Sequence, residues 1–188
     1  MRLLIYGSGD FAPTVIELVK ACGHEAVGLV DDMNDGPEIL GTFETVTRSH
    51  PPDSHGIALA IGYKNLPGRW AAWVRARAAG YEAPALIHPR AYVAASAQVD
   101  AGCMVMAGVV VDVRAKVDAA AVLWPSVCVN HDSHIGANCF LSPNATVCGF
   151  AQLGAHTFVG AGAAIADRCN VPPSSFIKML GRWPERSA

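Results

Sequence analysis

The residues best suited to chemistry lie in the second half of the chain, where a histidine precedes a carboxylate. Residues 129–136 read VNHDSHIG and contain His131, Asp132 and His134. Because the ordinary pKa of histidine is about 6.5, a neutral imidazole accepts protons near neutral pH, and His131 is a candidate general base. Neighbouring residues of a strand point to opposite faces. We therefore expect Asp132 either to be a polar corner residue or to act on a base through a bend, a water or another subunit.

A second candidate site, for a phosphate, lies near the N-terminus. Residues 7–12 read GSGDFA, between an apolar stretch at 2–6 and a helical stretch from about 13 to 21. In a turn of the form G-x-G-x-x-A, the glycines let the backbone approach a phosphate at the N-terminus of the helix. Taken alone, this fingerprint is a weak signal.

Two acidic residues strengthen the interpretation as a nucleotide site. A strand at about 26–30 ends at Asp31 and Asp32, whose carboxylates can accept hydrogen bonds from a ribose or a base. A further strand is expected at about 57–61 and a helix from about 66 to 79. A dinucleotide-binding domain is built from two such halves, so one half favours a binder of a single nucleotide over a dehydrogenase.

A six-residue repeat fills most of the remaining chain and must position His131. A period of six fits neither an amphipathic helix nor an alternating strand, and it is typical of a β-helix of hexapeptide repeats. A small residue, which leaves room for a corner, follows four positions after each aliphatic one. The aliphatic positions are Val93, Val99, Val105, Val111, Val117, Leu123, Val129, Ile135, Leu141, Val147, Leu153, Val159, Ile165 and Val171.

The repeat also makes His131 exceptional. The position two residues after each aliphatic one is almost always small or apolar, and His131 is its one imidazole. Asp167 is the only other polar residue at this position. A bulky ionisable group where the fold prefers alanine breaks a local rule, and such breaks concentrate at functional sites.

Composition excludes several classes of function. The 14 basic and 16 acidic residues give a net charge of −2, which argues against a nucleic-acid-binding protein with a basic face. No apolar run reaches the roughly 18 residues of a membrane span. The six cysteines contain no C-x-x-C pair, so we expect no disulfide framework and a cytoplasmic protein.

In these motifs the chain resembles the bacterial sugar-nucleotide acetyltransferases of the sialic acid O-acetyltransferase type, and their relatives that N-acetylate nucleotide-linked 4-amino sugars. The resemblance covers nearly the whole chain. It implies a left-handed β-helix, a homotrimer with active sites between subunits, acetyl-CoA as co-substrate and no metal. The segments that carry it are IYG at 5–7, VDD at 30–32, AIG at 60–62 with Asn65 and Arg69, LIHP at 86–89, and VNHDSHIG at 129–136.

The resemblance also implies roles for individual residues. His131 matches the general base and Asp132 an acidic residue that raises its basicity. Gly149 matches a glycine whose backbone N–H meets the acetyl carbonyl of acetyl-CoA. Phe140 stands where a relative has a histidine that contacts the coenzyme, and we place His134 in the same site. The positions that match sugar-nucleotide contacts are Ser8, Gly9, Asp31, Asp32, Gly62 and Asn65.

We therefore expect an α/β nucleotide-binding domain at 1–87, a left-handed β-helix at 88–175 and a tail at 176–188. The expected activity is acetyl transfer from acetyl-CoA to a nucleotide-linked sugar, to an amine rather than a hydroxyl, in surface glycan synthesis such as that of lipopolysaccharide. One alternative is a zinc lyase of the carbonic anhydrase type, using His131, His134 and His156 between subunits. The other is a non-catalytic scaffold that binds a sugar nucleotide.

Overall fold

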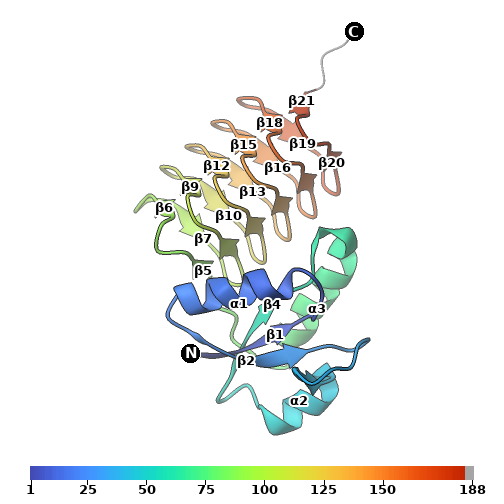
Figure 1. Ribbon diagram of the computed structural model, residues 1–188. Coiled ribbons are helices and arrows are strands. Elements are labelled where there is room, and N and C mark those ends of the chain that lie inside the picture. Colours follow the sequence, from blue (N-terminus) through green and yellow to red (C-terminus); the bar gives the residue numbers. More distant parts are fainter. Residues whose placement is uncertain (185–188) are drawn as a thin grey trace. The chain divides into compact units, whose positions relative to one another are not determined.

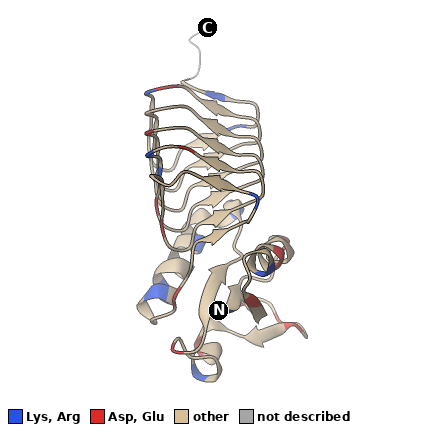
Figure 2. Cartoon of the chain, turned by 90° about the vertical axis from the view of Figure 1, so that its left-hand side faces the viewer, with Lys and Arg blue, Asp and Glu red and all other residues tan. Residues whose placement is uncertain are grey.

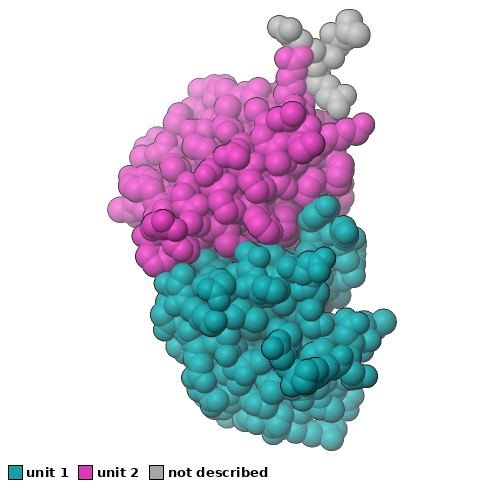
Figure 3. Space-filling model, viewed as in Figure 1, with its two compact units in different colours: residues 1–86 teal, residues 87–188 magenta. Residues whose placement is uncertain are grey.

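A computed structural model gives the structure of the chain and describes residues 1–184 (Figure 1). These residues form two compact units that divide after Leu86 (Figure 3). The boundary expected from the sequence, between residues 87 and 88, lies one residue further along.

Unit 1 is built on a four-stranded parallel sheet in the order β3-β2-β1-β4. Leu3, Leu4 and Ile5 of β1 are fully buried, as expected for a central strand covered on both faces. The expected α/β class is confirmed. The strands are β1 (Arg2–Tyr6), β2 (Glu25–Val30), β3 (Ile39–Gly41) and β4 (Gly56–Leu59); the helices are α1 (Ala12–Ala21), α2 (Phe43–Ser49), the short 3-10 helix η1 (Tyr63–Asn65) and α3 (Leu66–Ala78).

Strand β3 and helix α2 are additions to the elements that the sequence predicts. Strand β3 has only three residues, too few to show a period of two. Helix α2 begins at a side-chain cap, because the hydroxyl of Thr42 accepts a hydrogen bond from the backbone N–H of Thr45 at 3.3 Å.

Unit 2 is a parallel β-solenoid of about five turns, as the hexapeptide repeat predicts. Strand β10 pairs with β13 so that Lys116 lies beside His134, eighteen residues later, and three hexapeptides therefore make one coil. Three sheets form its sides: β19-β16-β13-β10-β7, β20-β17-β14-β11-β8-β5 and β21-β18-β15-β12-β9-β6.

All seventeen strands of the solenoid have two residues. They are β5 (Leu86–Ile87), β6 (Tyr92–Val93), β7 (Gln98–Val99), β8 (Met104–Val105), β9 (Val110–Val111), β10 (Lys116–Val117), β11 (Val122–Leu123), β12 (Cys128–Val129), β13 (His134–Ile135), β14 (Phe140–Leu141), β15 (Thr146–Val147), β16 (Gln152–Leu153), β17 (Phe158–Val159), β18 (Ala164–Ile165), β19 (Asn170–Val171), β20 (Phe176–Ile177) and β21 (Arg182–Trp183).

The corners of the coils have a common backbone geometry. From residue 102 to residue 180, every sixth residue has a φ between 56° and 73°, in the left-handed region. Only three of these fourteen positions are glycine, although a non-glycine residue pays roughly 1–2 kcal/mol there. The stacked coils therefore hold the corners in place. The non-glycine corner residues are Arg114, Ala120, Ser126, Asp132, Asn138, Asn144, Phe150, His156, Arg168, Ser174 and Leu180.

The solenoid continues beyond residue 175, so the expectation of a tail at 176–188 is wrong for its described part. Strands β20 and β21 lie in this segment. The physical reason is that the repeat itself continues, with Ile177 and then Trp183 at the next six-residue steps after Val171. Residues 185–188 lie outside the described part of the chain.

Within residues 1–184, no helix has both the length and the apolar character needed to cross a bilayer. Most charged residues of the solenoid lie in the corners between its strands, and the strands themselves contain few of them (Figure 2).

Candidate functional site

His131 lies at the corner between β12 and β13, next to the carboxylate that follows it in the chain. Its Nδ1 is 3.0 Å from Oδ2 of Asp132. The sequence argument that strand neighbours point apart does not apply, because Asp132 is a left-handed corner residue with a φ of 57°. The bend of the corner turns the carboxylate toward the imidazole of its own chain.

Arg114, one coil earlier, fixes the same carboxylate from its other side. Its Nε and one terminal nitrogen donate to the two oxygens of Asp132 at 2.7 and 2.8 Å. Hydrogen bonds from Arg114 and His131 lower the pKa of Asp132 to about 2. Asp132 is therefore an acceptor at neutral pH, so the neutral imidazole of His131 donates from Nδ1 and keeps a free lone pair on Nε2.

Gly149 occupies the equivalent position one coil after His131. A Cβ at this residue would lie 2.9 Å from Nε2 of His131 and 3.1 Å from Oδ1 of Asp167, one coil further. A larger residue would thus collide with the imidazole, and glycine leaves the space open. Among the described residues, the backbone N–H of Gly149 donates no hydrogen bond.

An aromatic ring and a second ion pair complete this edge of the solenoid. The Phe150 ring meets the His131 ring edge to face, with 5.2 Å between centroids. The guanidinium of Arg168 lies 4.2 Å from the centre of the Phe150 ring, and its Nε is 3.3 Å from Oδ2 of Asp167. His131 and its neighbours form one continuous row over four coils.

Sequence reasoning missed Arg114, Phe150 and Arg168, and it gave Asp167 no role. The sequence does contain a signal that could have found them, because all four positions lie a multiple of eighteen residues from Asp132 or His131. Once three hexapeptides are assigned to a coil, such residues stack above one another.

The other two histidines of the repeat have different partners. Nε2 of His134 is 2.8 Å from Oδ2 of Asp118, beside a pocket of about 430 Å³. Nδ1 of His156 is 3.0 Å from the side-chain amide of Asn138. Neither is brought to His131, and within residues 1–184 no three His, Cys, Asp or Glu side chains gather in a metal-binding arrangement.

Phe140 lies in a column of aromatic side chains. Its ring centroid is 6.1 Å from that of Trp124 and 6.3 Å from that of Phe158. Phe158 in turn stacks on Phe176 at 4.7 Å. Phe140, where the resemblance leads us to expect a coenzyme contact, is therefore part of a column of apolar rings.

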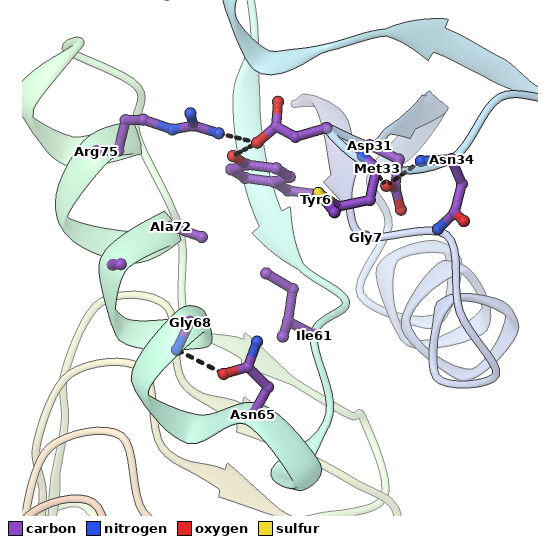
Figure 4. A pocket seen from close by; sticks show the side chains of 12 residues that line it. Tyr6, Gly7, Asp31, Met33, Asn34, Ile61, Asn65, Gly68, Ala72 and Arg75 are labelled. Carbon is purple, nitrogen blue, oxygen red and sulfur yellow. Dashed lines mark hydrogen bonds and ion pairs between the residues drawn. The ribbon is translucent and has the colours of Figure 1, made fainter.

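A pocket of about 430 Å³ lies at the carboxyl edge of the unit 1 sheet, where the sequence places the nucleotide site (Figure 4). The carboxyl ends of parallel strands are the usual ligand site of such sheets. The lining residues are Tyr6, Gly7, Asp31, Asp32, Met33, Asn34, Ile61, Asn65, Gly68, Ala71, Ala72 and Arg75.

Asp31 organises the loop at one side of this pocket. One of its oxygens accepts hydrogen bonds from the N–H and hydroxyl of Ser8 at 2.9 and 2.7 Å. The other accepts from the N–H groups of Met33 and Asn34 at 2.8 and 2.9 Å. Partial burial raises the pKa of Asp31, but these hydrogen bonds outweigh it and lower the pKa to about 2.

Asp32 pairs with a cation that sequence reasoning did not select. Its Oδ2 accepts from the Tyr6 hydroxyl at 2.5 Å and is ion-paired with Arg75 of α3. Its Oδ1 accepts from the N–H of Phe43 at 2.9 Å. The Arg75 guanidinium also lies over the rings of Tyr6 and Phe43, with its carbon 5.3 and 4.5 Å from their centroids. No motif identifies Arg75, because it lies more than forty residues from Asp32.

The remaining predicted contacts differ in how close they lie to the pocket. Asn65 lines the pocket and caps α3, since its side-chain oxygen accepts from the N–H of Gly68 at 2.9 Å. Ser8 does not line the pocket itself but contacts two residues that do: its hydroxyl donates to Asp31 and accepts from the side-chain amide of Asn34 at 3.5 Å. Among the described residues, Gly9 and Gly62 do not line the pocket, whereas the nearby residues Gly7 and Ile61 do.

Two family models match the chain. The model of the PglD N-terminal domain matches residues 2–74, and the model of the bacterial transferase hexapeptide (six repeats) matches residues 132–167. Comparison with curated proteins gives no match.

Solved structures extend the similarity over the whole chain. The acetyltransferase domain of PglB from Neisseria gonorrhoeae FA1090 is 26% identical with a TM-score of 0.89, covering 100% of this chain and 93% of that chain. PerB from Caulobacter crescentus, in complex with CoA and GDP-perosamine, is 26% identical with a TM-score of 0.89, covering 98% and 89%. The PglB domain in complex with acetyl coenzyme A is 25% identical with a TM-score of 0.82, covering 96% and 97%. Over its whole length the chain is therefore similar to these solved acetyltransferase structures, with an α/β domain followed by a parallel β-solenoid.

Proposed function

We propose that the protein transfers the acetyl group of acetyl-CoA to the amino group of a nucleotide-linked sugar. The observation that carries the proposal is the site of His131, in which Asp132 holds Nδ1 and the imidazole edge with Nε2 lies against Gly149. Relatives of matching length were solved with acetyl coenzyme A, or with CoA and GDP-perosamine. One of them is named as a perosamine N-acetyltransferase.

His131 acts as the general base. Its Nε2 takes a proton from the sugar amine while the amine nitrogen forms a bond to the carbonyl carbon of the thioester. The N–H of Gly149 donates to the carbonyl oxygen as this gains negative charge, an interaction worth about 3 kcal/mol in comparable sites. The C–S bond then breaks, and the departing thiolate takes the proton from Nε2, which leaves the amide and CoA thiol.

The pocket of unit 1 holds the nucleotide. Asp31 shapes the loop, and Asp32 and Asn65 line the space in which the base and ribose bind. Ser8, Gly9 and Gly62 belong to the surrounding turns, and Arg75 adds a cation that suits a phosphate. For acetyl-CoA we retain Gly149 as the carbonyl contact, and His134 and Phe140 as contacts to the rest of the coenzyme.

The working form is a homotrimer in the cytoplasm, with each site completed by a neighbouring copy, and the product enters surface glycan synthesis. The hexapeptide-repeat family supports this assembly. Sedimentation analysis of the purified protein tests it, and a monomer that turns over at the full rate contradicts it.

Thiol release from acetyl-CoA tests the function directly. The acceptors are 4-amino sugars linked to UDP, GDP or dTDP, and His131→Ala is compared with the wild type. We expect release with at least one acceptor and a loss of about 10²- to 10⁴-fold in kcat for His131→Ala. His156→Asn is the matched control, since a φ of 61° suits asparagine.

Two results contradict the proposal. Near-normal turnover by His131→Ala excludes this residue as the base. No release with any acceptor, together with a melting temperature unchanged by acetyl-CoA and by every sugar nucleotide, points to a non-catalytic scaffold.

A further inference from the structure

A carboxylate faces the free nitrogen of the base across Gly149, and the mechanism above leaves it unused. The point where a Cβ of residue 149 would lie is 2.9 Å from Nε2 of His131 and 3.1 Å from Oδ1 of Asp167. That point is one bond length from Cα of Gly149, so no substrate atom can occupy it. The two distances nevertheless place Nε2 and Oδ1 no more than about 6 Å apart, near enough for one substrate atom to hydrogen-bond to both. The other oxygen of Asp167 is held by Arg168, whose Nε lies 3.3 Å from Oδ2.

Both atoms are acceptors. Asp132 fixes the proton of the neutral His131 on Nδ1, so Nε2 offers a lone pair. An ionised Asp167 offers only lone pairs. A reacting atom placed between them must donate two hydrogens at once to satisfy both.

We propose that Asp167 is a second acceptor-binding residue, which holds the attacking nitrogen against His131 and selects an amine over a hydroxyl. An amine has at least two N–H groups, one for Nε2 and one for Oδ1. A hydroxyl has one hydrogen, so its oxygen would turn a lone pair toward one of the two acceptors. The side chains of His131 and Asp167 are 48% and 58% exposed, so the bound sugar itself must shield them from water. An acceptor that is shielded in this way and left without a donor counts against the hydroxyl. This inference rests on the proposed function and deepens it.

The position of Asp167 in the repeat is consistent with this role. It is one of two polar residues at a position that is otherwise small or apolar, and the other is His131. The two lie two coils apart with glycine between them, so neither touches the other. Each has its own partner on the outer side, Asp132 for the imidazole and Arg168 for the carboxylate. In the described part of the chain, these partners leave Nε2 of His131 and Oδ1 of Asp167 on the two sides of Gly149.

The test compares two acceptors that differ in one atom: a nucleotide-linked 4-amino sugar accepted by the wild type, and the same compound with a 4-hydroxyl group. Asp167→Asn keeps the shape of the side chain and removes its charge. We expect kcat/KM for the amine to fall about 10- to 100-fold, as for the loss of a hydrogen bond to a charged group. The preference for amine over hydroxyl should shrink, while KM for acetyl-CoA changes less than about twofold.

Asp100→Asn is the matched control, because this exposed carboxylate lies on another column of the solenoid, and its kcat/KM should match the wild type. Melting temperatures show whether both variants fold. A wild-type-like preference in a folded Asp167→Asn overturns the inference. So does a rise in KM for acetyl-CoA alone, which would place Asp167 on the coenzyme. Failure of the wild type itself with every amino sugar would instead count against the proposed function.

Discussion

The two ring nitrogens of His131 have different surroundings, and this asymmetry decides what the residue can do. Nδ1 faces an ionised carboxylate, while Nε2 faces the space left by Gly149. The side chain is 48% exposed, so substrates can reach it without a large rearrangement. The carboxylate is itself held by two hydrogen bonds from Arg114, which would be a positioning residue in the proposed function.

Replacing Arg114 tests this arrangement at the residue scale. Arg114→Gln removes the fork that orients Asp132, and we expect kcat to fall about 10-fold with little change in either KM, because the loss of one charged hydrogen-bond pair costs about 1.5 kcal/mol. Arg114→Lys keeps the charge and one hydrogen bond, so its kcat should lie between the kcat of Arg114→Gln and that of the wild type. A kcat for Arg114→Gln within twofold of the wild type would exclude the positioning role.

Asp31 gives a pH-dependent prediction. Its pKa is about 2 in the folded protein and about 3.9 in an unfolded chain, so the lowered value stabilises the fold above pH 4. This contribution disappears as the pH falls through 2. Urea unfolding should therefore show Asp31→Asn less stable than the wild type at pH 7, with a smaller difference at pH 2.5. An equal difference at both pH values would show that the carboxylate charge does not hold the loop.

At the scale of elements, the repeat predicts the coils because each hexapeptide forms the same unit, a short strand followed by a corner. The buried aliphatic row and the small row can be read directly from the sequence, and so can the α/β order of unit 1. The partners of His131 could not be read in the same way. Arg114 and Asp167 lie near His131 because the coils stack. The expectation that neighbouring strand residues point to opposite faces fails at Asp132, because this residue is a left-handed corner. Arg75 reaches Asp32 through the packing of α3, which no local pattern specifies.

The corner row offers a test of the coils themselves. Ser126 is an exposed corner residue with a φ of 62°. Glycine adopts this conformation without strain, so Ser126→Gly should leave the free energy of unfolding unchanged or raise it by up to about 1 kcal/mol. A β-branched side chain is strongly disfavoured in the left-handed region, so Ser126→Val should lower the free energy of unfolding by about 1–2 kcal/mol. Chemical denaturation measures both, and equal stabilities would contradict the corner geometry.

At the scale of the whole molecule, the two units have separate tasks built on different physical principles. Unit 1 gathers strand ends at one edge of a sheet, which produces a pocket lined by an acidic pair, one arginine and several apolar side chains. Unit 2 repeats one hexapeptide, so that a few exceptional side chains stand out from a uniform surface. In the proposed function, the first unit binds the sugar nucleotide and the second unit supplies the base for acetyl transfer.

The most direct measurement follows the acetyl group itself. Acetyl-CoA labelled with ¹³C in the acetyl group is incubated with a nucleotide-linked 4-amino sugar, and the product is examined by NMR. We predict an amide whose labelled carbonyl is bonded to the sugar nitrogen, formed by the wild type and not by His131→Ala. An ester to a sugar hydroxyl, or equal amide formation by both proteins, would contradict the account.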